Sequence, residues 1–473
     1  MIGAADLIAL LPLLFVAGGS VAAMLAIAIR RSHVLVAGLT VAALAGAFGC
    51  LWIAAAAAPR RVTALLIVDG YALFFMALLI GATAAVALLG YGYLEMRAGR
   101  REEFYVLLLT GTLGAMVLAA SSHLASFFLG LEILTVSLYA LIAYLPARRV
   151  SLEAGIKYLI LAASSAAFLL FGMALVYAAA GTMDLTGMLA AGADDILFVP
   201  GLILIVTGIG FKLAVVPFHM WTPDVYQGAP APIAAYIATV SKGAMFALLL
   251  RYYFASGARH AGAVFLIFSI IAISSMIAGN LLALLQTNVK RILAYSSIAH
   301  MGYLLVAFLA SGELAMQAAM FYLVAYLVST LGAFGIVSVL SSAESEAETL
   351  EDYRGLFWRR PALAGVFTAM LLSLAGIPLT AGFIGKFYVV SAGASSTLWA
   401  LIVILAITSG VGIFYYLRIV AAMCGSAAEI SEPRTAMPAG VVLTAATAFL
   451  LWFGIYPAPL LNAIRAALSQ LIA

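Results

Sequence analysis

Long apolar runs occupy most of the chain, and they constrain its fold more than any other feature of the sequence. About 20 apolar residues in a row can cross a bilayer as one helix. Inside the bilayer every backbone polar group must be satisfied within the protein, so such runs fold as helices. Only 9% of the 473 residues are charged. Since a soluble domain carries roughly 25% charged residues, the sequence predicts an all-α polytopic membrane protein.

The length rule predicts fourteen transmembrane helices when it is applied to each run in turn. An even number of crossings puts both ends of the chain on the same side of the membrane. The predicted helices cover residues 6–29, 33–58, 64–94, 104–120, 124–145, 155–180, 196–218, 231–254, 262–285, 291–310, 314–340, 361–392, 397–423 and 436–457.

The basic residues are divided unevenly between the two sides that these helices define. Thirteen lie in loops after odd-numbered helices, and five lie in loops after even-numbered helices. Because positively charged residues collect in cytoplasmic loops, both termini are predicted to face the outer side. The thirteen are Arg30, Arg31, Arg97, Arg100, Arg101, Arg148, Arg149, Lys290, Arg291, Arg354, Arg359, Arg360 and Arg434, and the five are Arg60, Arg61, Arg251, Arg259 and Arg465.

Five further basic residues lie inside predicted helices, and four of the five are lysines. A charged side chain deep in a bilayer is costly, so an intramembrane ionisable residue is a functional candidate. The fifth, Arg418, is instead interpreted as a packing charge, as are Asp69 and Glu313 near helix ends. The four lysines are Lys157, Lys212, Lys242 and Lys386.

One stretch, Gly208–Pro232, combines such a lysine with residues that interrupt a helix. Lys212 lies among apolar neighbours and is followed by Pro217 and Pro223. Proline removes a backbone donor and clashes with the preceding turn. Because an interrupted membrane helix is tolerated only where it is buried in protein or lines a wet cavity, Lys212 is predicted to lie at a functional site.

A looser counterpart of this pattern lies late in the chain, at Ser373–Phe387. Pro378 and its neighbouring glycines are expected to break helix twelve beside Lys386. Broken helices in corresponding places indicate an inverted repeat with a site near the middle of the membrane. Helices 4–8 and helices 9–13 are therefore predicted to form two inverted five-helix repeats. The predicted division is an N-terminal three-helix segment at 1–103, a first repeat at 104–254, a second repeat at 262–423, and a C-terminal helix with its tail at 424–473.

Glu132 is the carboxylate best placed to work with these lysines. It lies about eight residues into helix five, roughly 12 Å deep at 1.5 Å per residue, where an unpaired carboxylate is unfavourable. An opposite charge within about 4–6 Å favours the charged form of a lysine. Movement of Glu132 toward or away from Lys212 would therefore load or release a proton, with Lys242 as a central relay and Lys386 at one end. A structural ion pair that fixes helix packing is the alternative.

Lys157 and His300 each have two interpretations. Lys157 could extend to the cytoplasmic surface, or it could serve proton entry or coupling. His300 shares a polar face with Tyr295, Ser296 and Ser297. There it could shuttle protons near neutral pH, or it could be a hydrogen-bonded core residue.

Several kinds of chemistry are not indicated by the sequence. Cys50 and Cys424 are too few to ligate an iron–sulfur cluster, and we find no nucleotide-binding glycine motif and no metal-ligand cluster. The net charge of +4 follows from the topology and does not indicate nucleic-acid binding. The polar segment 341–360 is interpreted as a solvated cytoplasmic loop with a short amphipathic helix.

Seven stretches of the chain closely resemble the subunit N family of bacterial respiratory complex I, the counterpart of mitochondrial subunit 2. The strings VPFHMWTPD and GIPLTAGFIGKF within them are specific to the superfamily of proton-translocating, antiporter-like proteins. Lys386 distinguishes the chain from the related subunit M, which usually has a glutamate at this position. The stretches are Arg101–Leu109, His123–Glu132, Ser151–Tyr177, Phe211–Pro232, Gln286–Leu305, Tyr353–Pro361 and Ser373–Tyr388.

The resemblance implies a proton-translocating membrane subunit of an NADH:quinone oxidoreductase in the bacterial inner membrane, with both termini periplasmic. It implies Glu132 paired with Lys212, Lys242 as the central relay and Lys386 near the outlet. It places flavin, iron–sulfur clusters and quinone in other subunits, with no cofactor in this chain. The expected partners are membrane-arm subunits, especially antiporter-like subunit M and the small subunit K, and the lipid bilayer. The alternatives are a subunit of a multi-subunit sodium/proton antiporter and a structural membrane-arm scaffold.

Overall fold

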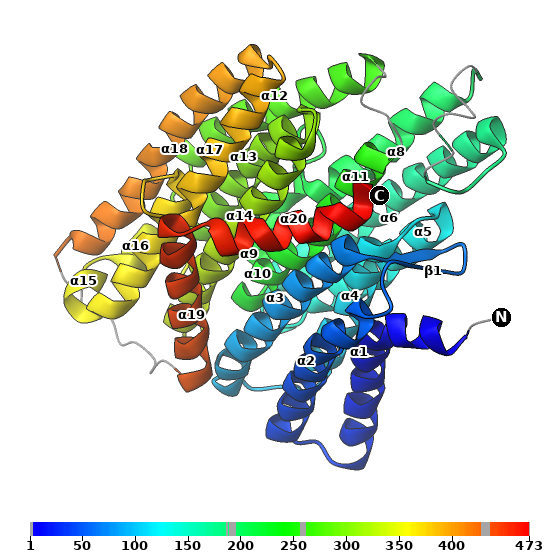
Figure 1. The fold of residues 1–473 in the computed structure, drawn as a ribbon. Helices are drawn as coiled ribbons and strands as arrows, with labels where there is room; N and C mark the ends of the chain where they lie inside the picture. Colours follow the sequence, from blue (N-terminus) through cyan, green and yellow to red (C-terminus); the bar gives the residue numbers. More distant parts are fainter. Residues whose placement is uncertain (1–2, 186–187, 189–194, 256–261, 427–435, 473) are drawn as a thin grey trace.

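The computed structural model describes residues 3–185, 188, 195–255, 262–426 and 436–472. These residues form a bundle of helices that run roughly side by side (Figure 1). Arg259 and Arg434, two of the basic residues from which the orientation is predicted, lie outside the described residues.

The first half of the chain supplies ten described α-helical segments, one π-helical turn and the only two strands of the described residues. In order they are α1 (Ala4–Ile29), α2 (His33–Ala55), β1 (Arg60–Val62), β2 (Leu66–Val68), α3 (Gly70–Glu95), α4 (Glu103–Ala120), α5 (Leu124–Ile142), α6 (Arg149–Ala180), α8 (Phe198–Leu213), α9 (Trp221–Gly228), α10 (Ala231–Tyr236), η1 (Ile237–Ser241) and α11 (Lys242–Ala255).

The second half is helical throughout its described elements. In order they are α12 (Gly262–Leu284), α13 (Val289–Leu309), α14 (Glu313–Leu340), η3 (Leu350–Tyr353), α15 (Leu356–Arg359), α16 (Pro361–Ala375), α17 (Ala381–Ser395), α18 (Trp399–Cys424), α19 (Met437–Ile455) and α20 (Ala458–Ile472).

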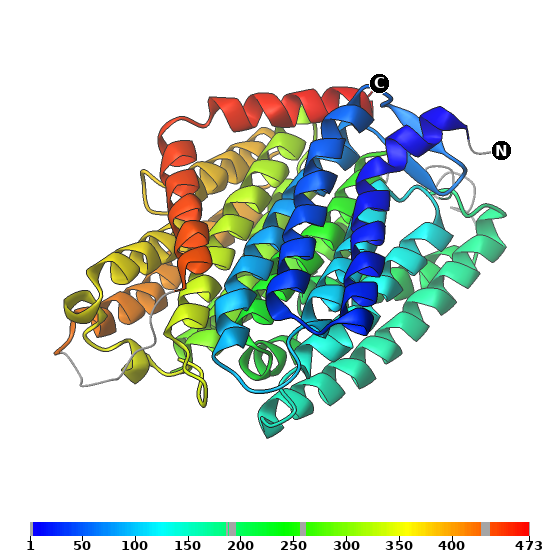
Figure 2. The same cartoon turned by 90° about the horizontal axis from the view of Figure 1, so that it is seen from below.

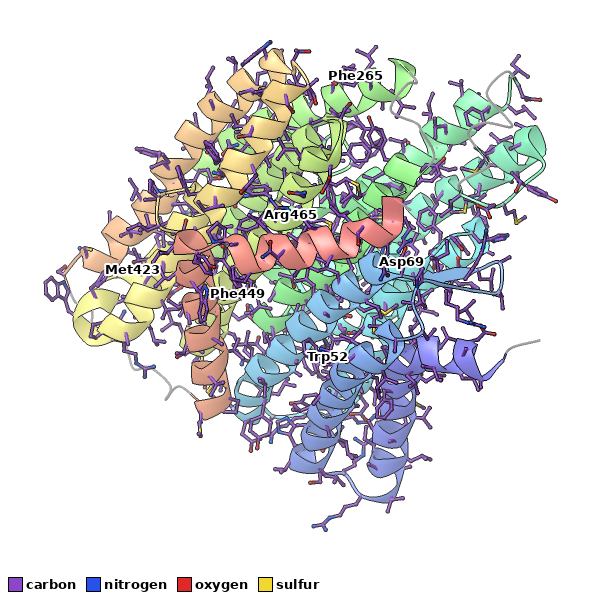
Figure 3. All side chains as sticks on the ribbon, viewed as in Figure 1. Trp52, Asp69, Phe265, Met423, Phe449 and Arg465 are labelled. Carbon is purple, nitrogen blue, oxygen red and sulfur yellow. The ribbon has the colours of Figure 1, made fainter. Side chains whose placement is uncertain are left out.

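Twelve helices of the described chain are long and apolar enough to cross a membrane, and the continuous helix from α10 to α11 counts as one of them. Of the two remaining predicted spans, 196–218 contains the shorter helix α8, with α9 following just beyond it, and 361–392 is divided between α16 and α17. Large apolar side chains such as Trp52 point outward from the bundle (Figure 3). Helices α10–α11, α13 and α14 are almost completely buried, so they form the centre of the bundle.

The first predicted break is confirmed, but only one of its two prolines causes it. Helix α8 ends at Leu213, and Ala214 then takes a left-handed backbone conformation with φ 58°. The chain passes through Pro217 before α9 begins. Pro223 lies in the first turn of α9. The N–H groups of a first turn have no partner within the helix, so the missing N–H of proline costs no helical hydrogen bond there. The prediction of a break at Pro223 was therefore wrong, and a second interruption falls instead between α9 and α10.

The second predicted break is also confirmed. Helix α16 ends at Ala375, and Gly376 follows with φ 83°, a conformation that glycine adopts without steric cost. Thr380 then starts α17, because its side-chain oxygen accepts a hydrogen bond from the Phe383 amide at 3.4 Å.

The predicted start of helix three at residue 64 was wrong. Residues 60–68 form an antiparallel hairpin in which Arg60 pairs with Val68, and α3 begins only at Gly70. Asp69 sets this start, because its carboxylate accepts a hydrogen bond from the Ala72 amide at 2.8 Å and so caps the helix. The same carboxylate is bound by the buried Arg251 guanidinium at 2.7 and 2.8 Å.

The C-terminal tail contains a helix that the sequence reading missed. Helix α20 crosses one end of the bundle instead of running along it (Figures 1 and 2). It buries Leu461, Ile464 and Leu468, whose spacing of three and four residues places them on one face of a helix. The Gln470 side chain accepts a hydrogen bond from the Gly70 amide at 2.6 Å, so the described end of the chain lies beside the start of α3.

The segment 341–360 is only in part the solvated loop that its composition suggested: Glu344 and Ser345 are exposed, but other residues point into the protein. The side chain of Glu346 is completely buried, and that of Tyr353 is buried as well. Lys290, counted above as a loop residue, lies inside α13 with no exposed side-chain surface. The prediction from composition was wrong for these residues because oppositely charged groups from distant parts of the chain pair inside the protein. Pairing makes the burial of such charges tolerable.

Candidate functional site

Lys212 lies in the last turn of α8, and its ammonium contacts two other helices, α5 and α6. Only 4% of the residue is exposed. The ammonium donates hydrogen bonds to the Thr135 hydroxyl of α5 and, at 2.9 Å, to the Tyr158 hydroxyl of α6. It also lies 5.3 Å from the centre of the Tyr158 ring, within range of a cation–π interaction.

Glu132, the predicted partner of Lys212, forms no ion pair with any residue of the described chain. One of its carboxylate oxygens is buried without a hydrogen-bond partner. The charges of Glu132 and Lys212 nevertheless interact electrostatically. Thr135 lies one turn from Glu132 on α5, where residues three apart are neighbours. The hydroxyl of Thr135 thus takes the contact with Lys212 that was expected of the carboxylate.

Lys242 lies where the π-helical turn η1 passes into α11, and it is fully buried. Its ammonium donates a hydrogen bond to the Ser297 hydroxyl of α13 and lies 5.7 Å from the centre of the Tyr226 ring. Ser297 also bonds the hydroxyls of Tyr326, at 2.9 Å, and Tyr226, at 3.4 Å. Lys242 is therefore joined to a group of hydroxyls that can both donate and accept protons.

His300 continues this polar face of α13, one turn beyond Ser296 and Ser297. Its two ring nitrogens contact the hydroxyls of Tyr322, at 2.6 Å, and Tyr416, at 3.1 Å. Tyr416 in turn is hydrogen-bonded to Ser296. Both Lys242 and Lys386 are close enough to interact electrostatically with the imidazole.

Lys386 lies in α17, after the second break. Its ammonium donates to the Ala375 carbonyl oxygen at 2.7 Å and to the Ser409 hydroxyl at 2.7 Å. It lies 5.2 Å from the centre of the Tyr303 ring. Because Ala375 is the last residue of α16, the lysine binds the negative end of a broken helix, which favours a cation.

Lys157 does not join this group. Its side chain is 44% exposed and forms ion pairs with Glu153 at 2.7 Å and with Asp224 at 2.9 Å. Asp224 is also bound by Arg291 at 2.8 Å. The structure therefore places Lys157 in a partly exposed charge cluster, as the surface interpretation of the sequence expects. Arg418 likewise binds backbone carbonyls, those of Leu284 and Gln286, as a packing charge does.

The hydroxyl partners of the lysines were not predicted from the sequence. Serine, threonine and tyrosine carry no charge, so they do not stand out in membrane helices as the lysines do. One signal was available. Thr135 lies three residues from Glu132, so the two are neighbours on one helix face, and Tyr158 directly follows Lys157 in a stretch already singled out for its charge. The hydroxyl residues that were missed, which contact the lysines, Ser297 or His300, are Thr135, Tyr158, Tyr226, Tyr303, Tyr322, Tyr326, Ser409 and Tyr416.

No group of three or more histidine, cysteine, aspartate or glutamate side chains in the described chain could hold a metal ion. Cys50 and Cys424 are both free thiols. The site therefore consists of lysines, one histidine, one carboxylate and hydroxyls, which can hold and pass protons.

Residues 121–412 match a protein family described as NADH:quinone oxidoreductase/Mrp antiporter, TM. A protein of Methylococcus capsulatus named NADH-quinone oxidoreductase subunit N is 51% identical over 97% of this chain and 94% of its own length. The chain belongs to the subunit N family. A chain of respiratory complex I from Thermus thermophilus is 35% identical, with a TM-score of 0.84 over 96% of this chain and 99% of that chain.

The fold is shared more widely than the subunit N family. A chain of the Mrp complex from a Dietzia species superposes with a TM-score of 0.86 over 98% of this chain and 97% of that chain, at 19% identity. At this identity the likeness concerns the fold alone. The antiporter-like architecture is thus common to complexes of different kinds.

Proposed function

We propose that this chain is the antiporter-like subunit N of a proton-translocating NADH:quinone oxidoreductase, and that it relays protons through Lys212, Lys242, His300 and Lys386. The observation that carries the proposal is the environment of the three lysines. All three are buried, and within the described residues none is paired with a carboxylate. A structural lysine at such depth would be expected to have a paired counter-charge, whereas these lysines face hydroxyls that exchange protons.

In this proposal the proton travels from the first break to the second. Redox chemistry in other subunits changes the distance between Glu132 and Lys212, and Lys212 then gains or loses a proton. The proton moves through water to Lys242, which lies at the centre of the bundle beside Ser297. The hydroxyls and the imidazole of α13 lead on toward Lys386, near the outlet. Moving one charge against 100 mV requires about 2.3 kcal/mol, which a change in the distance between the charges of Glu132 and Lys212 can supply at low dielectric constant.

The proposed architecture has fourteen crossings, with α8–α9 and α16–α17 each serving as one broken span beside the twelve continuous ones. The first repeat comprises helices 4–8 and the second helices 9–13. Both termini face the periplasm of a bacterial inner membrane, as the distribution of basic loops indicates. The neighbouring subunits are M and K, and flavin, iron–sulfur clusters and quinone are bound elsewhere in the complex.

Replacement of Lys242 by alanine tests the proposal in the assembled complex. We expect NADH-driven proton uptake into membrane vesicles to be abolished, because the central group of the relay is lost. The control is Ser164→Ala, which removes an exposed hydroxyl on α6 that bonds only its own helix. Unchanged proton uptake and quinone reduction in an assembled Lys242→Ala complex would contradict the relay.

A sodium/proton antiporter subunit is the second candidate, favoured by the fold shared with the Mrp chain. Purification of the chain with its native partners separates the two. Recovery of NADH-oxidising subunits with flavin and iron–sulfur centres supports the complex I role. Sodium-dependent proton flux without those subunits supports the antiporter.

A further inference from the structure

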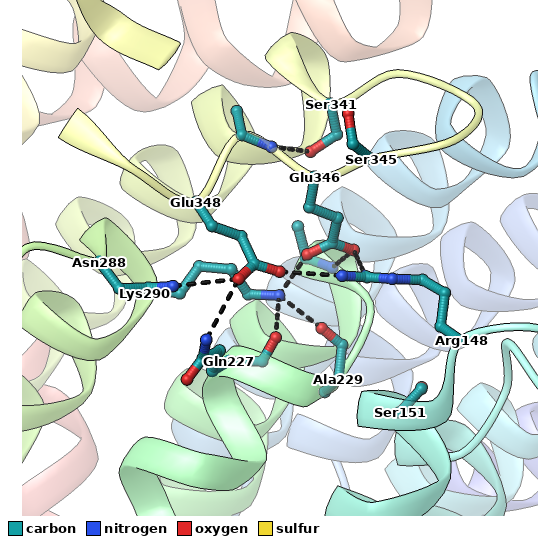
Figure 4. Close-up of polar contacts among 12 residues, drawn as sticks. Arg148, Ser151, Gln227, Ala229, Asn288, Lys290, Ser341, Ser345, Glu346 and Glu348 are labelled. Carbon is teal, nitrogen blue, oxygen red and sulfur yellow. Dashed lines mark hydrogen bonds and ion pairs between the residues drawn. The ribbon is translucent and has the colours of Figure 1, made fainter. Parts of the chain in front are cut away.

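Residues 341–350, which connect α14 to η3, form a strap across the end of the bundle opposite α20 (Figures 2 and 4). The strap is attached to the start of α13 by two backbone hydrogen bonds. The Val289 amide donates to the Glu348 carbonyl at 2.6 Å, and the Leu350 amide donates to the Thr287 carbonyl at 3.3 Å. These bonds fix the strap so that Glu346 points into the protein.

Glu346 meets groups from α3, α10 and α13 and from Arg148, the residue just before α6. Its carboxylate is paired with the Lys290 ammonium of α13 and with the Arg148 guanidinium at 3.1 Å. It also accepts hydrogen bonds from the Tyr93 hydroxyl of α3 and from the Ala231 amide at the start of α10, the latter at 3.2 Å. Burial alone would raise the pKa of this carboxyl, but Lys290 and Arg148 outweigh it and hold the pKa below its usual range. Glu346 is therefore ionised at neutral pH.

Lys290 is bound on its other side by the end of α9. Its ammonium donates hydrogen bonds to the carbonyl oxygens of Gln227, at 2.8 Å, and Ala229, at 2.7 Å (Figure 4). The pair thus occupies both sides of the interruption between α9 and α10. The cation binds the carbonyls where one helix ends, and the anion binds an amide where the next begins. Each charge has the sign that the helix end favours, and each satisfies groups that a helix end leaves unpaired.

The two helices that meet at this interruption position Lys242 and one of its neighbours. Tyr226 in α9 lies under the Lys242 ammonium and contacts Ser297. Lys242 itself follows Ala231 by eleven residues, roughly 16 Å at 1.5 Å per residue, along the continuous helix formed by α10 and η1. A shift of the junction would therefore move Tyr226 and Lys242 relative to Ser297.

We propose that Glu346 and Lys290 are positioning residues for the relay, since they cap both sides of the α9–α10 interruption and so set the place of Lys242 against Ser297 and Tyr226. This inference rests on the proposed function of Lys242. It assigns a role to two residues that do not themselves carry the proton.

The first test is Glu346→Gln in the assembled complex, with Glu344→Gln as the matched control on the exposed part of the same strap. Glutamine keeps an acceptor for the Ala231 amide but removes the charge that holds Lys290. We expect proton uptake per NADH oxidised to fall at least about fivefold, the lower end of the effect expected when a buried charged partner is lost. The pH profile of proton uptake should change in the Glu346→Gln complex and stay unchanged in the control. Unchanged uptake and an unchanged pH profile in assembled Glu346→Gln complex would overturn the proposal.

The second test is the double variant Lys290→Met with Glu346→Leu, which removes both charges while keeping apolar volume. Replacing a buried ion pair by apolar side chains is often tolerated, so we expect the complex to assemble. Because the carbonyls of Gln227 and Ala229 and the amide of Ala231 then lack their caps, proton uptake should remain impaired. Restored uptake would show that the pair only balanced its own charges. Failure of the double variant to assemble would show a role in assembly, and would likewise contradict the proposal.

The two proposals fail in different ways. Full proton uptake in Lys242→Ala would remove the relay and this inference with it. Loss of uptake in Lys242→Ala together with normal uptake in both strap variants would leave the relay intact and overturn the positioning role alone.

Discussion

The two broken helices hold their lysines on opposite sides of the break. Lys212 precedes the first break and has neutral hydroxyl partners, Thr135 and Tyr158, with Glu132 at a distance. Lys386 follows the second break and binds the Ala375 carbonyl at the end of α16. At the first break a carbonyl in the last turn of α8, that of Phe211, is bound by the Trp221 indole at 3.0 Å instead.

This difference separates two functions that a lysine beside a break can have. Lys386 stabilises the broken backbone as well as carrying a charge, because it is itself the cap of α16. At the first break Trp221 binds a carbonyl at the end of α8, so Lys212 does not cap that helix. Its ammonium can therefore respond to a moving carboxylate. The first break is therefore suited to coupling with a neighbouring event, and the second is suited to a fixed terminal position in the relay.

The largest expected effect is a contrast between the two lysines. Lys212→Ala should abolish proton uptake while the complex assembles normally, because Trp221 still caps α8. Lys386→Ala should lower both proton uptake and the yield of assembled complex, because the end of α16 loses its cap. Complex yield from membranes and NADH-driven proton uptake in vesicles measure the two effects. Equal yields for the two variants would contradict the claim that Lys386 caps a helix end and Lys212 does not.

A second contrast concerns the packing of the second break. A Cβ atom at Gly382 would overlap the carbonyl oxygen of Ser373, whereas a Cβ at Gly365 would meet nothing nearby. Gly382→Ala should therefore force α17 away from α16 and destabilise the chain by about 1–3 kcal/mol. Gly365→Ala is the matched control on α16 and should have no effect. Thermal unfolding of the purified complex, followed by loss of activity, measures the difference.

A smaller effect is expected from the hydroxyl partner of Lys212. Thr135→Val keeps the shape of the side chain and removes one of two hydroxyls that bind the ammonium. Loss of one hydrogen bond to a buried charged group costs about 1–3 kcal/mol of stabilisation. Turnover and proton uptake should therefore both fall, while the complex assembles normally. Unchanged proton uptake in Thr135→Val would show that Tyr158 alone positions Lys212.

The smallest effect is expected from the corresponding change at the second break. Ser409→Ala leaves Lys386 its bond to the Ala375 carbonyl, which lies at a favourable helix end. Proton uptake should therefore fall less than in Thr135→Val when the two complexes are assayed side by side. A larger loss of proton uptake in Ser409→Ala would contradict the assignment of coupling to the first break and of a fixed terminal position to the second.

Much of this arrangement could be predicted from the sequence, because prolines, glycines and intramembrane charges have strong local effects. Pro217 and Pro378 mark both breaks, and the four lysines and Glu132 stand out against an apolar background. The contacts of these residues could not be predicted. Thr135 and Ser409 reach their lysines from other helices, and a helix pattern does not say which faces meet.

The errors have a common physical origin in long-range pairing. Glu346 lies in a segment as polar as a solvated loop, yet Lys290, fifty-six residues away, neutralises it inside the protein. The start of α3 was misplaced because the apolar run Leu66–Val68 satisfies a helix and a strand equally well. Only its pairing with β1 decides between them, and register between strands is set by partners that a single window does not contain.

A structure of the assembled complex that resolves ordered water tests the central claim most directly. The account predicts a chain of hydrogen-bonded water molecules that joins Lys212 to Lys242 and continues past His300 to Lys386. Water molecules within hydrogen-bond distance of each lysine nitrogen, roughly 2.7–3.2 Å, would bear out the relay. Dry apolar packing between the lysines would contradict it.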